Sequence, residues 1–199
     1  MGIPGRQSKL LLSKKNFYFF HNRIFSALLA KNPITWECVS LMRNELLLGD
    51  LAPDFTLRAV GGSYGDGEEL RLSSLRGRAV VLYFYPKDDT PGCTAQACDL
   101  RDRYSAFVSK DVLVFGVSVD SSKSHTKFIA KYALPFPLLS DESREVVQAY
   151  GVWVEKSMYG KKYMGTERST FVIGEDGTIR AIHRKIQPAA HAEAVLKNL

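Results

Sequence analysis

The sequence predicts an α/β fold in which a central mixed β-sheet carries helices on both faces. Residues 79–85 and 112–119 are almost wholly apolar and rich in β-branched and aromatic side chains, which is typical of strands buried on both faces. Between them, residues 94–108 repeat apolar side chains at helical spacing, so this unit predicts two parallel strands joined by a helix. Residues 169–173 and 178–182 flank the turn Glu-Asp-Gly and predict an antiparallel hairpin, which makes the sheet mixed.

The segments before residue 79 predict a second hairpin. Residues 55–58 are a candidate for a short strand. Residues 61–67 hold four glycines in seven positions, which is typical of a tight turn. This turn leads into a further strand at 68–72, so we expect the two short strands to pair.

The elements after residue 119 complete the predicted sheet. A helix capped by Ser121 or Ser122 runs to about residue 132. The other predicted elements are a short strand at 138–140, a helix at 142–150 that Gly151 stops, and a C-terminal helix opened by Pro188. Together the elements resemble a thioredoxin-like fold.

Length and charge indicate one domain with a basic extension. The chain has 199 residues, and its apolar fraction of 45% is ordinary for a packed core. Residues 1–48 hold seven Lys/Arg and two Asp/Glu, a net charge of +5, whereas residues 49–199 hold twenty and nineteen, a net charge of +1. A nearly neutral body argues against a nucleic-acid-binding protein. We expect a poorly ordered extension over residues 1–46 and the domain over residues 47–199.

The extension has two alternative interpretations. Residues 1–36 contain no acidic residue, six Lys/Arg and three Ser, a composition that resembles an organellar presequence. It is too short and too charged to span a membrane. Alternatively, translation starts at Met42 and the segment before it results from the choice of start site. We expect a cytoplasmic protein, or a mitochondrial or plastid protein if residues 1–46 are a presequence.

The three cysteines, Cys38, Cys93 and Cys98, are too few for a disulfide scaffold and suit a reducing compartment. A structural zinc site usually needs four ligands at CxxC-like spacing. Here four residues separate Cys93 from Cys98 and the sequence has no second Cys/His cluster. We therefore expect no metal and no cofactor, and we interpret Cys38 as a bystander.

Cys93 lies where an apolar strand ends and a turn with Pro and Gly leads into the predicted helix. Only the thiolate of a cysteine is a nucleophile, and the N-terminus of a helix favours that charged form. We expect Thr90 to donate its hydroxyl to the sulfur or to a bound oxygen. Pro86 and Pro91 would stiffen a loop that shields the sulfur. Arg168, just before the C-terminal hairpin, is the candidate for a guanidinium beside it.

The residues near Cys93 suit a peroxide as the electrophile. No histidine lies near it in the sequence, which argues against a Cys–His protease or an acyl-transfer enzyme. Folding could nevertheless bring His125 or His183 close. We otherwise expect the histidines at the surface. A thiolate with donors and no base suits attack on an O–O bond, which gives a sulfenic acid that a second thiol converts to a disulfide. Cys98 is close enough in sequence to be that thiol.

The spacing of the two cysteines has a structural consequence. Residues five apart on an intact helix have Cα atoms about 8–9 Å apart and point about 140° from each other. A disulfide requires Cα atoms within about 7 Å. We therefore expect oxidation to unwind the first turns of the helix that begins near Cys93.

The run YPKDDTPGCTAQAC, from Tyr85 to Cys98, closely resembles the peroxiredoxins, whose motif is P-x-x-x-[ST]-x-x-C. The cysteine spacing resembles the PrxQ branch, also called bacterioferritin comigratory protein. The similarity covers about residues 47–199, with further matching segments at 49–55, 150–153, 158–161 and 168–171. By motif matching, Cys93 resembles the peroxidatic cysteine and Cys98 the resolving cysteine, and the remaining active-site residues are Pro86, Thr90 and Arg168.

The resemblance implies a thioredoxin fold and an antioxidant enzyme of cell redox homeostasis. It would reduce hydrogen peroxide and organic hydroperoxides to water and alcohols through a Cys93–Cys98 disulfide, which thioredoxin or a similar dithiol protein reduces. We expect a monomer that binds neither nucleic acid nor membranes. Two alternatives stay open: a protein dithiol–disulfide oxidoreductase, which normally has a CxxC motif, and a non-enzymatic interaction module with this fold.

Overall fold

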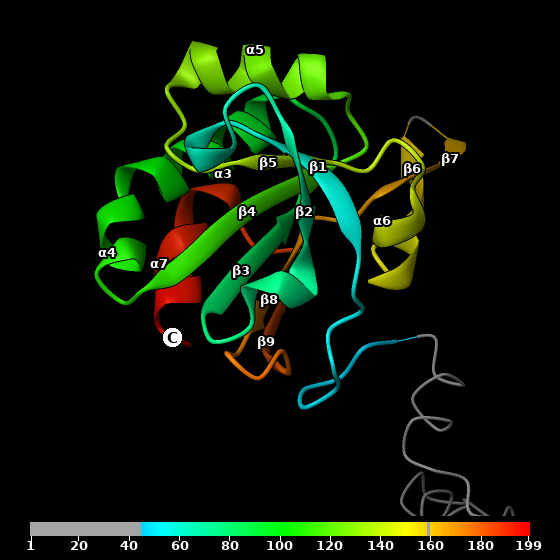
Figure 1. Ribbon diagram of the computed structural model, residues 1–199. Coiled ribbons are helices and arrows are strands. Elements are labelled where there is room, and N and C mark those ends of the chain that lie inside the picture. The colour runs from blue at the N-terminus through cyan, green and yellow to red at the C-terminus, as the bar shows by residue number, and fades with distance from the viewer. Residues whose placement is uncertain (1–44, 159) are drawn as a thin grey trace, which may run out of the picture. The chain divides into compact units, whose positions relative to one another are not determined.

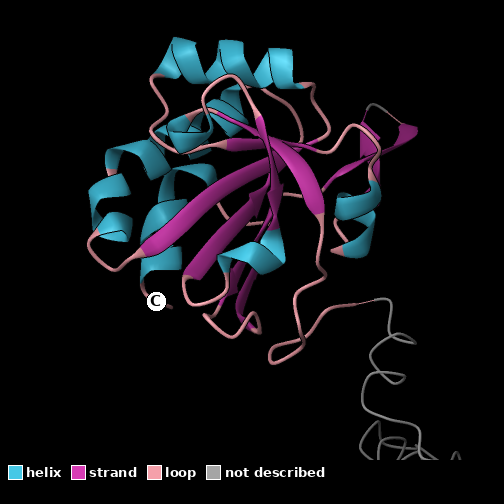
Figure 2. Ribbon diagram, in the orientation of Figure 1, coloured by secondary structure: helices cyan, strands magenta, loops and turns pink. Residues whose placement is uncertain are grey.

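The structure, a computed structural model, describes residues 45–158 and 160–199, and Figures 1 and 2 show its helices and strands. The strands are β1 (Thr56–Val60), β2 (Glu68–Arg71), β3 (Ala79–Phe84), β4 (Val112–Ser118), β5 (Leu138–Ser140), β6 (Trp153–Met158), β7 (Lys161–Thr166), β8 (Ser169–Ile173) and β9 (Ile179–Arg184). The helices are α3 (Pro91–Asp102), α4 (Tyr104–Val108), α5 (Ser122–Tyr132), α6 (Glu145–Ala149) and α7 (His191–Leu196).

Seven strands form the main sheet in the order β2-β1-β5-β4-β3-β8-β9. β4 pairs in parallel with both β3 and β5, and the other neighbours are antiparallel. The predicted parallel pair and both predicted hairpins are therefore present. The mixed central sheet is confirmed.

The alternating side chains of β3 pack into a hydrophobic core on each face of the sheet. Val80 and Leu82 pack in one cluster with Val147 from α6. Val81 and Tyr83 pack in the other cluster with apolar side chains from α3, α4, α5 and α7. Because successive side chains of a strand point to opposite faces, an unbroken apolar run is what a strand covered on both faces requires. The prediction of helices on both faces is confirmed.

The helix predicted over residues 94–108 starts earlier and is broken. α3 begins at Pro91, at the first helical position. Proline is tolerated there, because an N–H group at this position would have no acceptor within the helix. The backbone leaves the helical conformation at Arg103, with φ −110° and ψ 11°, and α4 follows as a separate short helix. This earlier start moves Cys93 into the first turn of α3.

Two other predicted helices are shorter than expected. The segment 142–150 is helical only over α6, because Arg144 before it adopts a left-handed backbone with φ 66°. At the C-terminus, Pro188–Ala190 form a 3₁₀ turn, and α7 begins only at His191.

β6 and β7 form a hairpin that the sequence did not predict. Among the described residues they pair only with each other, in a two-stranded sheet, and they project from the domain at the side of α6 (Figure 1). Most of their side chains are exposed or half-buried, so the hairpin has no apolar run that would reveal it. Its position matters, because it borders the site described below.

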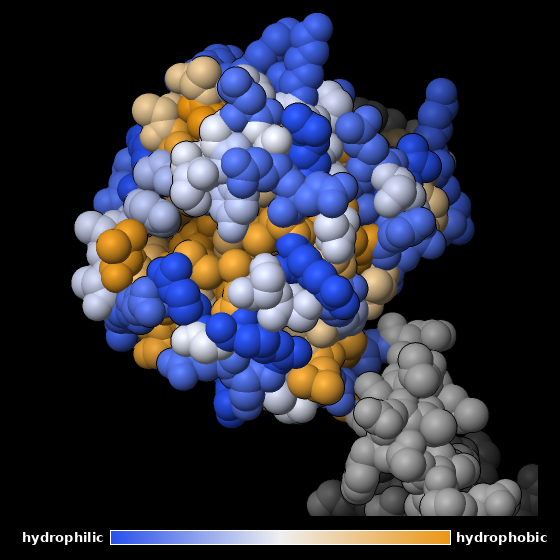
Figure 3. Space-filling view, viewed as in Figure 1, coloured by the Kyte–Doolittle hydropathy of each residue, from blue (hydrophilic) through white to orange (hydrophobic). Residues whose placement is uncertain are grey.

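Hydrophilic side chains cover much of the face shown in Figure 3, and apolar groups are visible in the gaps between them. Every helix within residues 45–158 and 160–199 is too short or too polar to span a lipid bilayer. The predicted presequence, the alternative start at Met42 and Cys38 all lie outside the described residues. The boundary between residues 46 and 47 stays a prediction.

Candidate active site

Cys93 is the third residue of α3, and its side chain is buried, with 2% exposed. Thr90 is the N-cap residue, but no described side chain caps the first turn. The amide groups at this end of the helix are therefore left to interact with a negative charge, which the helix dipole also favours. The sulfur sits where an anion is stabilised.

Arg168 places its guanidinium beside this sulfur. Its Nη2 lies 3.6 Å from Cys93 Sγ. The approach follows from the sheet, because Ser169 pairs with Phe84, the last residue of β3, and the loop after β3 leads into α3. Gly92 leaves room for the guanidinium, since a Cβ at that position would lie 3.1 Å from Arg168 Nη2. The predicted neighbour of the sulfur is in contact with it.

Thr90 makes a different contact from the one expected. Its hydroxyl donates to the carbonyl oxygen of Lys87 at 3.0 Å and closes the loop before α3, so it does not donate to the Cys93 sulfur. With its proton engaged in the loop, the Thr90 oxygen keeps lone pairs that can accept a hydrogen bond. Thr90 is half-buried and lies on the same loop as Pro86.

A cavity of about 500 Å³ adjoins the site and has Pro86 and Arg168 in its wall. Burial, and next the charge of Arg168, lower the pKa of Lys156 in the same wall. The other lining residues come from the β6–β7 hairpin and the segments near it: Val154, Glu155, Ser157, Tyr163, Glu167, Lys185 and Ile186. A larger hollow of about 780 Å³ contains none of the predicted site residues, so we assign the site to the smaller cavity.

Cys98 also lies on α3, is half-buried and is a free thiol like Cys93. Because the helix is continuous between the two, their side chains point about 140° apart and their Cα atoms are about 8–9 Å from each other. They do not meet in this conformation. Among the described residues, no group of three or more His, Cys, Asp or Glu side chains is arranged to hold a metal ion.

The prediction that the histidines lie at the surface is wrong for two of them. His125 and His191 are both 0% exposed, and His183 is half-buried. Each nitrogen of the two buried rings has a polar partner within the fold, which lowers the cost of burying a polar side chain. Both lie near the loop or the helix that carries Cys93.

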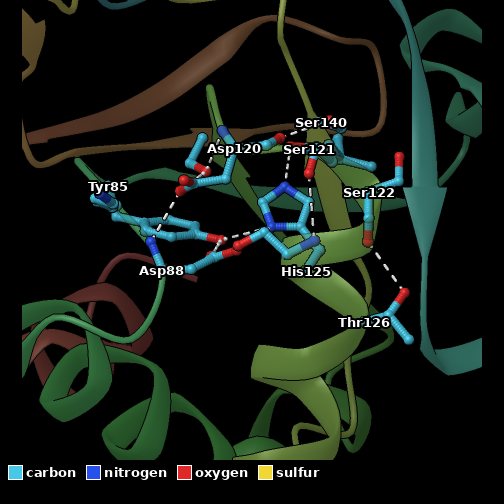
Figure 4. Close-up of polar contacts among 12 residues, drawn as sticks. Tyr85, Asp88, Asp120, Ser121, Ser122, His125, Thr126 and Ser140 are labelled. Carbon is cyan, nitrogen blue, oxygen red and sulfur yellow. Dashed lines mark hydrogen bonds and ion pairs between the residues drawn. The ribbon is translucent and has the colours of Figure 1, made fainter.

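His125 holds the loop between β3 and α3 through Asp88. Figure 4 shows the Asp88 carboxylate between the His125 ring and the Tyr85 hydroxyl, with Nδ1 of His125 2.9 Å from Oδ2 and the hydroxyl donating to Oδ1 at 2.7 Å. Ser124 donates to the same carboxylate at 2.7 Å, and the Asp88 amide donates to Asp120 at 2.8 Å. Burial, and next the charge of Asp88, raise the pKa of Tyr85, so this phenol stays a neutral donor. The cluster fixes the loop that carries Pro86 and Thr90.

His191 packs against α3 from the start of α7. Its Nδ1 lies 3.2 Å from Nε2 of the buried Gln96, and its Nε2 lies 2.6 Å from Oγ1 of Thr170. Burial, followed by the charges of His183 and Arg168, lowers the pKa of His191 from 6.5 to about 3. The ring is therefore neutral in the folded protein at neutral pH.

This buried ring gives a testable pH dependence of stability. Between about pH 6.5 and pH 3 the unfolded chain binds a proton on His191 that the folded chain excludes, so the free energy of unfolding falls as the pH drops through this range. One pKa unit corresponds to about 1.4 kcal/mol, so the loss amounts to several kcal/mol. Urea unfolding at about pH 7 and pH 4 measures it. His191→Asn is expected to show a smaller loss, and an equal loss in both proteins would contradict the assignment.

Comparison with known proteins places the chain in a family. The AhpC/TSA family profile matches residues 48–182. The chain is 44% identical over 153 residues to peroxiredoxin Bcp of Bacillus subtilis, covering 76% of this chain and 94% of that protein. It is 42% identical over 153 residues to peroxiredoxin Bcp of Escherichia coli, covering 77% and 95%. A solved structure of a PrxQ mutant from Xylella fastidiosa superposes with a TM-score of 0.71 at 34% identity, covering 78% of this chain and 96% of that one.

A buried cysteine at the start of a helix, with a guanidinium against its sulfur, is the arrangement that thiolate attack on a peroxide needs. The family match and the identity to Bcp peroxiredoxins extend over most of the chain. The chain therefore belongs to the AhpC/TSA family and is a thiol peroxidase of its Bcp/PrxQ peroxiredoxin group.

Proposed function

We propose that Cys93 is the peroxidatic cysteine and Cys98 the resolving cysteine of this thiol peroxidase. The observation that carries the proposal is the Arg168 guanidinium, 3.6 Å from Cys93 Sγ at the first turn of α3. A positive charge and free amide groups around one sulfur favour its thiolate. Cys98 is five residues away on the same helix and is the nearest thiol in the sequence.

The first step is attack of the Cys93 thiolate on the terminal oxygen of a hydroperoxide. The S–O bond forms as the O–O bond breaks, which leaves a sulfenic acid and an alkoxide, or hydroxide from hydrogen peroxide. The leaving oxygen takes a proton from solvent and departs as an alcohol or water. Arg168 and the amide groups of the first turn stabilise the developing negative charge, as preorganised donors do in other enzymes.

Thr90 and Pro86 orient and shield the peroxide in this proposal. Because the Thr90 proton is donated to Lys87, its oxygen accepts the hydrogen bond of the peroxide O–H. Pro86 offers no backbone N–H and borders the cavity, so it excludes water from the reacting atoms.

Cys98 then attacks the sulfenic sulfur of Cys93 and water leaves as the disulfide forms. Thioredoxin or a similar dithiol protein reduces this disulfide by thiol–disulfide exchange. Since the two sulfurs point apart on the intact helix, resolution requires α3 to unwind locally.

We propose that the substrates include organic hydroperoxides as well as hydrogen peroxide. The wall of the cavity of about 500 Å³ beside Arg168 is mostly polar but includes Pro86, Val154 and Ile186, which would contact the carbon chain of an alkyl hydroperoxide. A similar solved structure, the bacterioferritin comigratory protein of Xanthomonas campestris, is described by its alkyl peroxide reduction activity; it is 39% identical with a TM-score of 0.66, covering 72% of this chain and 88% of that one.

We further propose a monomeric enzyme that works in the cytoplasm. Its partners would be the hydroperoxide and the dithiol reductant, with no nucleic acid and no membrane. The nearly neutral charge of residues 49–199 supports the absence of a nucleic-acid surface. If residues 1–46 are a cleaved presequence, the compartment is a mitochondrion or plastid, and mass spectrometry of the mature N-terminus decides between these proposals.

A coupled assay tests this function. Wild-type protein is expected to consume hydrogen peroxide continuously with thioredoxin, thioredoxin reductase and NADPH. Cys98→Ser is expected to react only once, because it forms the Cys93 sulfenic acid but has no second thiol to resolve it within the chain. Trapping with dimedone and mass spectrometry detects that acid. Full turnover by Cys98→Ser with thioredoxin would show that an outside thiol resolves Cys93 and that Cys98 is not required.

A further inference from the structure

A chain of buried polar groups leads from the Cys93 sulfur to the C-terminal helix. Arg168 donates through Nη2 to the sulfur and through Nη1 to Oε1 of Gln96, which lies one turn after Cys93 on α3. Nε2 of Gln96 is 3.2 Å from Nδ1 of His191, the first residue of α7. The opposite nitrogen of this ring is 2.6 Å from Oγ1 of Thr170. Gln96, Thr170 and His191 are each 0% exposed.

The chemistry of each group decides which one donates and which one accepts in this series of hydrogen bonds. A guanidinium only donates, so Gln96 must present its carbonyl oxygen to Arg168. The NH₂ group of Gln96 then faces Nδ1 of His191, which must accept with its lone pair. The proton of the neutral ring is left on Nε2 and is donated to Thr170. Reversing the Gln96 amide would set donor against donor at Arg168 and acceptor against acceptor at His191.

We propose that His191 is a positioning residue for the peroxide-reducing site, acting through Gln96 to hold the Arg168 guanidinium against the Cys93 sulfur. The inference rests on the proposed function, in which Cys93 is the attacking thiolate. His191 touches neither the sulfur nor the guanidinium in the described contacts. Its contribution is a lone pair that accepts a hydrogen bond from the Gln96 NH₂ group and so anchors the amide that Arg168 has oriented.

In this arrangement the buried Gln96 amide restricts the side chain of Arg168 beside it. An arginine side chain has many rotamers, and holding one of them has an entropic cost. The guanidinium packs close to the backbone of Gly92, where even a Cβ would lie only 3.1 Å from Nη2. Gln96 limits it through a hydrogen bond on Nη1. Without His191 the amide of Gln96 loses its second anchor, and the guanidinium is held less firmly.

Three variants separate this role from simple packing. His191→Leu removes the acceptor and keeps an apolar side chain in the core. His191→Asn keeps an acceptor, because its Oδ1 occupies the place of Nδ1. His183→Leu is the matched control, since among the described residues the His183 ring is hydrogen-bonded only to Asn198 and not to Gln96 or Arg168. Gln96→Met removes the same hydrogen bond from the other end with little change in volume.

The readout is the rate at which iodoacetamide alkylates Cys93 as a function of pH, followed on the Cys93 peptide by mass spectrometry. We expect His191→Leu and Gln96→Met to lose about tenfold in rate at neutral pH, the size of effect that one lost hydrogen bond can have, and to shift the profile to higher pH. The kcat/KM for hydrogen peroxide should fall by a similar factor. His191→Asn should restore most of the loss, and His183→Leu should match the wild type.

A folded His191→Leu with the wild-type alkylation profile would overturn the proposal. So would a His191→Asn variant as impaired as His191→Leu, since the side chain would then matter only for packing. If His191→Leu does not fold, an unchanged profile in Gln96→Met overturns the proposal in its place. Alkylation uses no peroxide, so a protein without peroxidase activity would contradict the proposed function and leave this test valid.

Discussion

Replacing Cys93 with serine is expected to abolish peroxide reduction while leaving the fold intact. The two side chains differ by one atom, and the buried site can hold either. A serine hydroxyl, however, is almost wholly protonated at neutral pH and is a weak nucleophile without an adjacent base, and no described histidine is hydrogen-bonded to Cys93. The kcat/KM for hydrogen peroxide should fall at least about a thousandfold, which corresponds to roughly 4 kcal/mol of lost transition-state stabilisation.

Cys98→Ser is the matched control, because it makes the same chemical change on the same helix. It should retain one round of peroxide reduction, measured by rapid mixing with substoichiometric peroxide. Circular dichroism and thermal unfolding of the reduced variants check that both fold. A Cys93→Ser protein that consumes peroxide at the wild-type rate would show that another group attacks the O–O bond.

The fold was largely predictable because its central strands are buried on both sides. A short, unbroken apolar run such as Ala79–Phe84 is typical of a strand that is covered on both faces. The second run of this kind, which became β4, is its parallel partner. The turns carry their own local signals: the Glu-Asp-Gly turn between β8 and β9 lies in the predicted place. These features are encoded within a few neighbouring residues.

The β6–β7 hairpin was not predictable in the same way. Its strands are mostly exposed and hydrophilic, so neither period-two alternation nor an apolar run marks them. The start of α3 was misplaced for a related reason. Pro91 and Gly92 indicate a turn by composition, yet proline at the first helical position is also a helix start, and only the observed backbone separates the two.

The site residues that lie in a sequence motif were predictable. Those that only the tertiary fold brings to the site were not. Cys93, Thr90 and Pro86 lie within eight residues, and the resemblance also pointed to Arg168; their assigned roles stay predictions. The buried histidines gave no such signal. His125 meets Asp88 across 37 residues and His191 meets Gln96 across 95, and no local pattern encodes a contact at that separation.

Formation of the Cys93–Cys98 disulfide is expected to unwind the first part of α3. The bridge needs Cα atoms within about 7 Å, whereas five residues of intact helix hold them about 8–9 Å apart and facing different ways. The helical hydrogen bonds between the two cysteines must therefore break. Amide groups of residues 94–98 should lose their protection against hydrogen exchange and approach the rates of an exposed loop, as mass spectrometry of the reduced and oxidised protein would measure.

The contacts of α3 predict that the loss of structure spreads to two other parts of the protein. Gln96 lies inside the segment that unwinds, so its bonds to Arg168 and His191 should open with it. Asp99 accepts a hydrogen bond from the Ala192 amide at 2.7 Å, so the first turn of α7 should also exchange faster. The oxidised site would then stay disassembled until a dithiol reduces it.

The Cys98→Ser protein treated with one equivalent of peroxide separates the disulfide from oxidation itself. It carries the Cys93 sulfenic acid but has no bridge, so α3 and α7 should exchange as in the reduced wild type. Equal exchange in the reduced and disulfide-bonded wild type, with the bridge verified by mass, would mean that the cysteines meet without unwinding. Because the spacing of five residues on one helix forbids that, such a result would also contradict the helical conformation of residues 93–98 in the reduced protein.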